Sequence, residues 1–285
     1  MTVTFTGMQI AVGDKTFEAR AAGPEDGDVV LLLHGFPQTS WSWRHQLDAL
    51  GAAGYRAIAP DQRGYSPGAR PSEVEAYEIE HLVDDVIGMA DSLGVDRFHL
   101  VGHDWGAAVA WATAITRADR VRSLVALSVP HPDAFRRALQ GEGGSDQSSR
   151  SGYVDFFVSD GAAEAFTANG GEGLRNIFAL SGLSGDVQPY VDLLVQPGAM
   201  QAALNWYRAG FVDGSGRPAL GPCRVPTMFI WSTEDGALGP EGAKWTEQYV
   251  DAPYRFEVIE GVGHWIAESV PDRVDALLLE HLGGV

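Results

Sequence analysis

Four short stretches of the sequence carry side chains that could do chemistry together: "HGFPQ" (34–38), "GHDWGA" (102–107), "WSTEDGALG" (231–239) and "GVGHWIAE" (261–268). In the second stretch, Asp104 stands between Gly102 and Gly106 at the apex of a predicted sharp turn. The last two add an acidic residue at 234 or 235 and His264. An aspartate is ionised at neutral pH and can attack an electrophilic saturated carbon, which gives an alkyl-enzyme ester. A histidine oriented by a second carboxylate can then activate the water that hydrolyses this ester.

These stretches need a scaffold that brings them to one place, and the rhythm of the chain predicts one. Alternating apolar and polar residues over 3–11 and 15–21 predict a β-hairpin. Helical spacing of apolar residues over 79–93, between predicted strands, favours an α/β protein with a parallel, doubly wound sheet. The four stretches follow strand ends, where such sheets bind ligands. The remaining strands are expected at the apolar segments 29–35, 55–60, 97–102, 121–129, 227–231 and 254–260.

The alternation of strands and helices stops between residues 131 and 221. A polar connector rich in glycine and serine spans 139–152, and helical segments are expected at 171–183 and 197–210. The sequence therefore predicts three parts, which are an N-terminal core part over 1–130, a helical cap over 131–221 and a C-terminal core part over 222–285.

With these motifs in this order, the sequence resembles the α/β-hydrolase superfamily over nearly its whole length. The aspartate nucleophile, "HGFP" and "GHDW" resemble its branch of epoxide hydrolases and haloalkane dehalogenases. The resemblance implies an α/β-hydrolase fold, with a mostly parallel, doubly wound sheet and a helical cap inserted between two core strands. It also implies Asp104 as the nucleophile, His264 as the base, and an oxyanion hole made by the backbone N–H groups of Phe36 and Trp105.

Two neighbouring residues compete for the role of the acid that orients His264. "WSTEDGALG" resembles the family pattern W-G-x-x-D, which implies Asp235, although Ser232 replaces the glycine. Glu234 stays open as the alternative acid.

Opening an epoxide leaves an alkoxide that needs a proton donor, and the phenol of tyrosine is protonated at neutral pH, with an ordinary pKa of about 10. Epoxide hydrolases of this fold use two tyrosines from the helical cap. "ALNWYRA" resembles the second of the family's cap motifs and implies Tyr207. "GYVDFFVSDGAAE" (152–164) resembles the first and implies Tyr153, with Tyr190 as the alternative partner.

Aromatic side chains indicate an apolar substrate cavity, with Phe36, Trp105, Phe156 and Trp206 as its expected walls. We therefore expect an epoxide hydrolase whose partners are a small apolar epoxide and water. A haloalkane or haloacid dehalogenase with the same triad is one alternative. It would bind halide through the indole N–H groups of Trp105 and Trp206, because many dehalogenases have asparagine where this chain has Phe36. A receptor of the same fold that binds a small ligand without catalysis is another.

Composition argues against several other classes of function. The formal net charge of −18 disfavours nucleic acid and anionic membranes as partners, since both require a basic surface. Cys223 is the only cysteine, so neither an intrachain disulfide nor a cysteine-rich metal site is expected. The absence of a membrane-length apolar run and of a signal-peptide pattern predicts a cytoplasmic protein. We expect no metal or organic cofactor, and the oligomeric state stays open.

Overall fold

The centre of the protein is an eight-stranded sheet with the strand order β1-β2-β4-β3-β5-β6-β7-β8. The computed structural model describes residues 5–183, 185–211 and 219–285. β2 pairs with β1 and β4 in the antiparallel sense, and the other neighbours are parallel, which confirms the predicted hairpin and mostly parallel sheet. The strands are β1 (Thr6–Val12), β2 (Lys15–Ala22), β3 (Val29–Leu33), β4 (Arg56–Pro60), β5 (Phe98–His103), β6 (Val121–Leu127), β7 (Thr227–Ser232) and β8 (Tyr254–Ile259).

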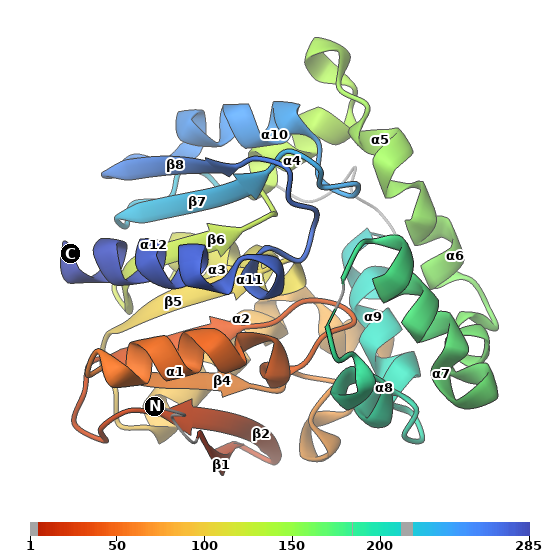
Figure 1. Ribbon diagram of the computed structural model, residues 1–285, viewed down its shortest axis with the longest axis horizontal. Coiled ribbons are helices and arrows are strands. Elements are labelled where there is room, and N and C mark those ends of the chain that lie inside the picture. Colours follow the sequence, from red (N-terminus) through yellow and green to blue (C-terminus); the bar gives the residue numbers. More distant parts are fainter. Residues whose placement is uncertain (1–4, 184, 212–218) are drawn as a thin grey trace.

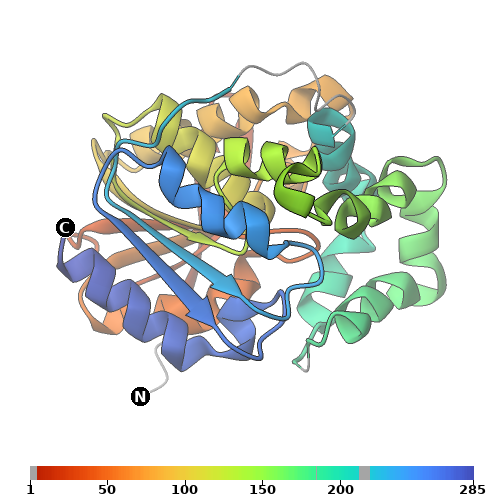
Figure 2. The same cartoon turned by 90° about the horizontal axis from the view of Figure 1, so that it is seen from above.

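Burial on both faces of the sheet explains the continuous apolar run of β3. Val30 and Leu32 belong to one cluster of core side chains, whereas Leu31 and Leu33 belong to another. Such two-sided burial is typical of parallel strands covered by helices. Figure 2 shows helices above and below the strands, as expected for a doubly wound sheet. The first cluster includes side chains of α1 (Arg44–Ala52) and α12 (Pro271–Gly283), and the second includes those of α2 (Ile79–Ser92), α3 (Trp105–Thr116) and α10 (Pro240–Trp245).

Between β6 and β7 the described part of the chain forms helices and loops without a strand of the sheet. Helices α6 to α9 of this insertion lie together beyond one end of the strands, on the right of Figure 1. The helices predicted over 171–183 and 197–210 overlap α7 and α9, while residues 212–218 of the predicted cap lie outside the described residues. No helix in the described ranges is both long and apolar enough to cross a membrane. The helices of the insertion are α4 (Pro132–Leu139), α5 (Gln147–Arg150), α6 (Val154–Val158), α7 (Ala162–Leu180), α8 (Gln188–Leu194) and α9 (Ala199–Phe211).

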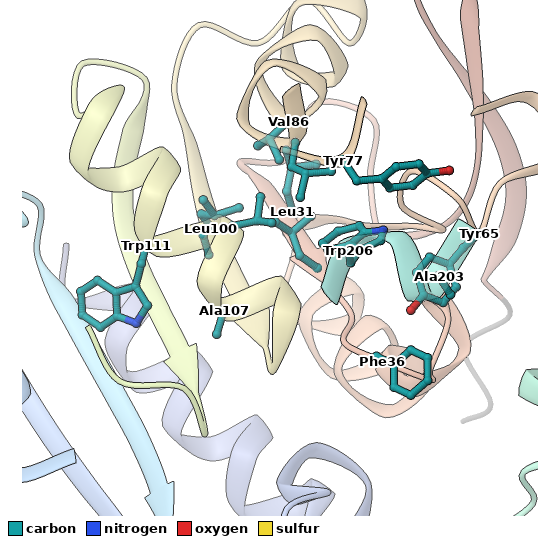
Figure 3. Packing of buried hydrophobic residues seen from close by; sticks show 14 of the residues in the cluster. Leu31, Phe36, Tyr65, Tyr77, Val86, Leu100, Ala107, Trp111, Ala203 and Trp206 are labelled. Atoms are coloured by element: carbon teal, nitrogen blue, oxygen red, sulfur yellow. The ribbon is translucent and has the colours of Figure 1, made fainter. Parts of the chain in front are cut away.

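Side chains of α9 attach the insertion to the core. Trp206 donates its indole N–H to the carbonyl oxygen of Arg63 at 2.9 Å, and its ring lies edge-on to that of Tyr65. Figure 3 shows Trp206 and Ala203 among the buried side chains of the same cluster, which also contains Tyr77. This packing holds α9 against the core and thereby positions the other side chains of α9 relative to the strand ends.

Candidate active site

Asp104 occupies a strained turn between β5 and α3. Its backbone has a φ of 53° and a ψ of −125°, a conformation that residues with a side chain rarely adopt. Gly106 permits the turn, because a Cβ atom at this position would lie 2.0 Å from the carbonyl oxygen of Leu33. The close packing of α3 on β3 therefore requires glycine. As the glycine-flanked motif predicts, the turn presents the Asp104 carboxylate at the end of a central strand.

The Asp104 carboxylate is buried but supported by hydrogen-bond donors. Its Oδ1 atom accepts the backbone N–H of Phe36 at 2.8 Å. A Cβ atom at Gly35 would lie 2.4 Å from Oδ1, so only glycine lets this loop come so close. Burial opposes ionisation, yet the nearby His264 and the adjacent backbone N–H of Trp105 hold the pKa of Asp104 below its ordinary value. The carboxylate is therefore ionised and fixed in orientation.

His264 lies between two carboxylates. Its Nδ1 donates to Oδ2 of Asp235 at 2.9 Å, and its Nε2 is 3.5 Å from Oδ2 of Asp104. Burial alone would lower the pKa of His264, but the charge of Asp235 and the nearby carboxylate of Asp104 raise it to about 10. The side chain of Glu234, the other candidate acid, is exposed. The geometry thus brings Asp104, His264 and Asp235 together and leaves Glu234 outside the group.

Two phenols from the insertion lie near Asp104. Tyr207 is buried on α9, and its ring centroid is 6.4 Å from that of Tyr153, which ends the short 3₁₀ helix Ser151–Tyr153. The ring of Trp105 lies edge-on to that of Tyr207, with the two centroids 5.2 Å apart. Tyr190 instead stacks on Phe178, in a separate cluster. The insertion therefore places Tyr153, rather than Tyr190, beside Tyr207.

Two cavities meet at this group of side chains. The larger has a volume of about 900 Å³ and the smaller about 280 Å³, and Asp104, Tyr153 and Tyr207 line both. Phe36 and His264 line only the larger cavity, and Trp105 lines only the smaller. A substrate could therefore reach the carboxylate with substituents extending in two directions.

Two aromatic residues expected on the cavity walls lie elsewhere. Phe156 is 48% exposed and packs its ring edge against Phe166, and Trp206 is buried in the core with its N–H donated to Arg63. Neither is among the residues that line the two cavities.

The described residues also contain no group of three His, Cys, Asp or Glu side chains arranged to hold a metal ion.

Comparison with known proteins agrees with this geometry. The family model described as alpha/beta hydrolase fold matches residues 28–269. This chain belongs to the α/β-hydrolase family. It is 37% identical to the AB hydrolase superfamily protein YfhM of Bacillus subtilis, with 94% of each chain covered, and 35% identical to epoxide hydrolase A of Mycobacterium tuberculosis, with 93% of each covered. A crystal structure of Bacillus megaterium epoxide hydrolase is similar with a TM-score of 0.87, at 28% identity over 97% of this chain and 100% of that one.

In this α/β hydrolase the main chain of His264 is anchored by two residues for which the sequence indicates no catalytic role. The carbonyl oxygen of His264 accepts a hydrogen bond from the hydroxyl of Ser128 at 3.3 Å and lies 2.9 Å from Nε2 of His103. Burial lowers the pKa of His103 to about 4, so this ring is neutral at pH 7. Ser128 has a left-handed backbone conformation, with a φ of 68°. Nothing in the sequence after the predicted strand indicates this conformation. These contacts hold the backbone of His264 in place, and with it the point from which the imidazole side chain extends.

We predict that His264 stabilises the folded protein fully below about pH 6.5 and progressively less up to about pH 10. The folded protein holds the His264 proton more tightly than the unfolded chain, so the advantage is lost as the pH rises through the folded pKa of about 10. Urea unfolding of the wild type and of His264→Gln at about pH 6, 8 and 10 measures it. The difference in free energy of unfolding should shrink as the pH rises. A difference that stays constant would contradict the proposed charge arrangement.

Proposed function

We propose that this α/β hydrolase is an epoxide hydrolase that converts a small apolar epoxide into a vicinal diol, with its helical insertion acting as the cap. The observation that carries the proposal is that the buried Asp104 carboxylate shares both cavities with the phenols of Tyr153 and Tyr207. The carboxylate supplies a nucleophile for saturated carbon, and a phenol supplies the acid that ring opening requires. The similarity to Mycobacterium tuberculosis epoxide hydrolase A supports the same class of substrate.

In the first step, Oδ2 of Asp104 attacks a ring carbon of the epoxide. The ring C–O bond breaks as the new C–Oδ2 bond forms, and Tyr153 or Tyr207 gives its phenolic proton to the departing oxygen. Desolvation and the charge of Asp104 raise the pKa of both phenols above 10, so both are protonated at neutral pH. The Oδ1 atom, held by the N–H of Phe36, becomes the carbonyl oxygen of the ester.

In the second step, His264 takes a proton from a water molecule that attacks Cγ of Asp104. The N–H groups of Phe36 and Trp105 stabilise the negative charge that develops on Oδ1, and losing one such donor typically costs roughly 3–4 kcal/mol. His264 then returns its proton to Oδ2 as the Cγ–Oδ2 bond breaks, and the diol leaves with this oxygen. The second proton of the water, on the regenerated carboxyl group of Asp104, passes to His264 and restores the imidazolium, which completes the balance.

Ester formation also prepares the base. While Asp104 is ionised, it acts together with Asp235 to keep His264 protonated. The ester carries no charge, so one of the two interactions that raise the pKa of His264 disappears. The imidazolium can then pass its proton to the phenolate left by ring opening, and the neutral imidazole serves as the base for hydrolysis.

The position of Trp206 favours epoxide opening over dehalogenation. A dehalogenase would need the indole N–H groups of Trp105 and Trp206 for a halide, but Trp206 lines neither cavity and donates its N–H to the carbonyl oxygen of Arg63. A receptor without catalysis has no need for an acid at Asp235 that orients a base. We therefore retain epoxide hydrolysis as the one proposed activity.

Incubation with styrene oxide and, separately, with a halogenated alkane tests this activity. We expect diol from the first and no halide ion from the second. Asp104→Asn should abolish diol formation, since an amide is a poor nucleophile, whereas Asp155→Asn, at an exposed carboxylate on α6, should retain it. Halide release without diol formation would contradict the proposal.

The phenols provide a second test. Tyr207→Phe should slow epoxide opening by roughly ten-fold or more, because general acids typically contribute a hundred-fold or more. Replacing Tyr153 as well should nearly abolish opening, since one phenol can partly substitute for the other. Tyr190→Phe is the control and should leave the rate unchanged. Pre-steady-state formation of the ester on Asp104 measures the effect, and a double variant as fast as the wild type would exclude the phenols as proton donors.

A further inference from the structure

We propose that Gln147 of the insertion is a positioning residue for the triad acid, an inference that rests on the two-step mechanism above. Gln147 begins α5 and is only 1% exposed. Its side-chain amide is hydrogen-bonded to two residues of one short segment, residues 235–239, which we name the acid loop. Nε2 donates to the carbonyl oxygen of Ala237 at 2.7 Å, and Oε1 accepts the N–H of Gly239 at 2.8 Å.

The acid loop holds the Asp235 carboxylate partly through the peptide group between Ala237 and Leu238, to which Gln147 is hydrogen-bonded. The N–H groups of Ala237 and Leu238 donate to Oδ1 of Asp235 at 2.9 and 3.0 Å. The carbonyl of Ala237 and the N–H of Leu238 belong to one planar peptide unit. Gln147 holds the oxygen of this unit while Asp235 accepts its hydrogen, so a rotation of the unit would break both contacts. Gln147 therefore fixes a donor that orients the carboxylate facing His264.

Arg150, three residues further along α5, adds a third contact with the acid loop. Its guanidinium donates to the carbonyl oxygen of Asp235 at 2.8 Å and is itself held by Asp146 at 2.8 Å. A Cβ atom at Gly239 would lie 3.3 Å from the Arg150 Nε atom, which shows how closely α5 approaches the loop. Figure 1 shows α5 at the junction between the core and helices α6 to α9. The insertion thus supports the triad from outside the core.

The same segment continues directly to Tyr153. The 3₁₀ helix Ser151–Tyr153 follows α5 without an intervening loop, so a stretch of seven residues, 147–153, links the acid loop to a proposed proton donor. A residue that merely packs the insertion on the core would affect both chemical steps through Tyr153 and Asp235 together. A residue that positions Asp235 would affect mainly the step for which His264 must be oriented. The two half-reactions therefore distinguish these roles.

A single-turnover reaction with styrene oxide and excess enzyme, followed by mass spectrometry of the Asp104 peptide, measures both steps. Gln147→Met keeps the side-chain length and loses both hydrogen bonds to the acid loop, together with a third, 3.1 Å long, to the hydroxyl of Ser151. Ester hydrolysis should slow by roughly ten-fold or more, since a misplacement of about 1 Å can cost a hundred-fold, while ester formation should change by less than about three-fold. The ester should accumulate, as expected for His264→Gln, which serves as the reference.

The pH dependence of ester hydrolysis gives a readout that a packing role would not move. His264 must be neutral to act as the base, and its remaining charged partner in the ester is Asp235. If Gln147→Met loosens this pair, the imidazole should lose its proton at lower pH, and the midpoint of the hydrolysis profile should shift down. Thr246→Val, the matched control, also loses two buried hydrogen bonds, to Gly242 and His131, and should leave the midpoint in place.

A second variant covers the case in which Gln147→Met does not fold. Arg150→Met changes a side chain that is already 28% exposed and should slow hydrolysis selectively, by a smaller factor. If the folded variants slow both steps equally, or neither, and leave the pH midpoint unmoved, the role assigned to Gln147 is wrong. A wild-type enzyme that forms no ester on Asp104 would instead overturn the proposed function, so the two failures are distinguishable.

Discussion

A protonated histidine held between two buried carboxylates is the interaction that the rest of this structure has to support. Burying charges is costly unless each is paired and hydrogen-bonded. Both conditions are met here, because Asp104 accepts the N–H of Phe36 while Asp235 accepts the N–H groups of Ala237 and Leu238. The charge of His264 therefore depends on loops from separate parts of the chain, and the chemistry proposed here begins when one of its two carboxylate partners is neutralised.

The sheet and the insertion make separate contributions to this arrangement. The sheet brings together the ends of β5, β7 and β8, which are followed in sequence by Asp104, Asp235 and His264. The strained backbone of Asp104 is maintained by the close packing of α3 on β3. The insertion adds the phenols, and Gln147 on α5 is hydrogen-bonded to the acid loop. Nucleophile and base thus stand on rigid core elements, whereas the proton donors and part of the acid's support come from the insertion.

Much of this organisation was predictable from the sequence, because it depends on local patterns. The strands follow from apolar runs, and the Asp104 turn follows from glycine spacing that leaves little conformational choice. The substrate walls were harder to predict, since an aromatic residue such as Trp206 is equally suited to a cavity and to the core. Its location is decided by a hydrogen bond to Arg63, a long-range contact without a local signal. The same applies to Gln147, which stands in a polar connector and finds its partners about 90 residues away.

The origin of the oxygen in the product tests the central claim most directly, namely that Asp104 attacks the epoxide and that water attacks only the resulting ester. With enzyme in excess over epoxide in ¹⁸O-labelled water, the first diol should stay largely unlabelled, because its new oxygen comes from Oδ2 of Asp104. The label should appear in the Asp104 peptide, which mass spectrometry can detect. A labelled first-turnover diol together with an unlabelled Asp104 would show that water attacks the epoxide directly, and would contradict this account.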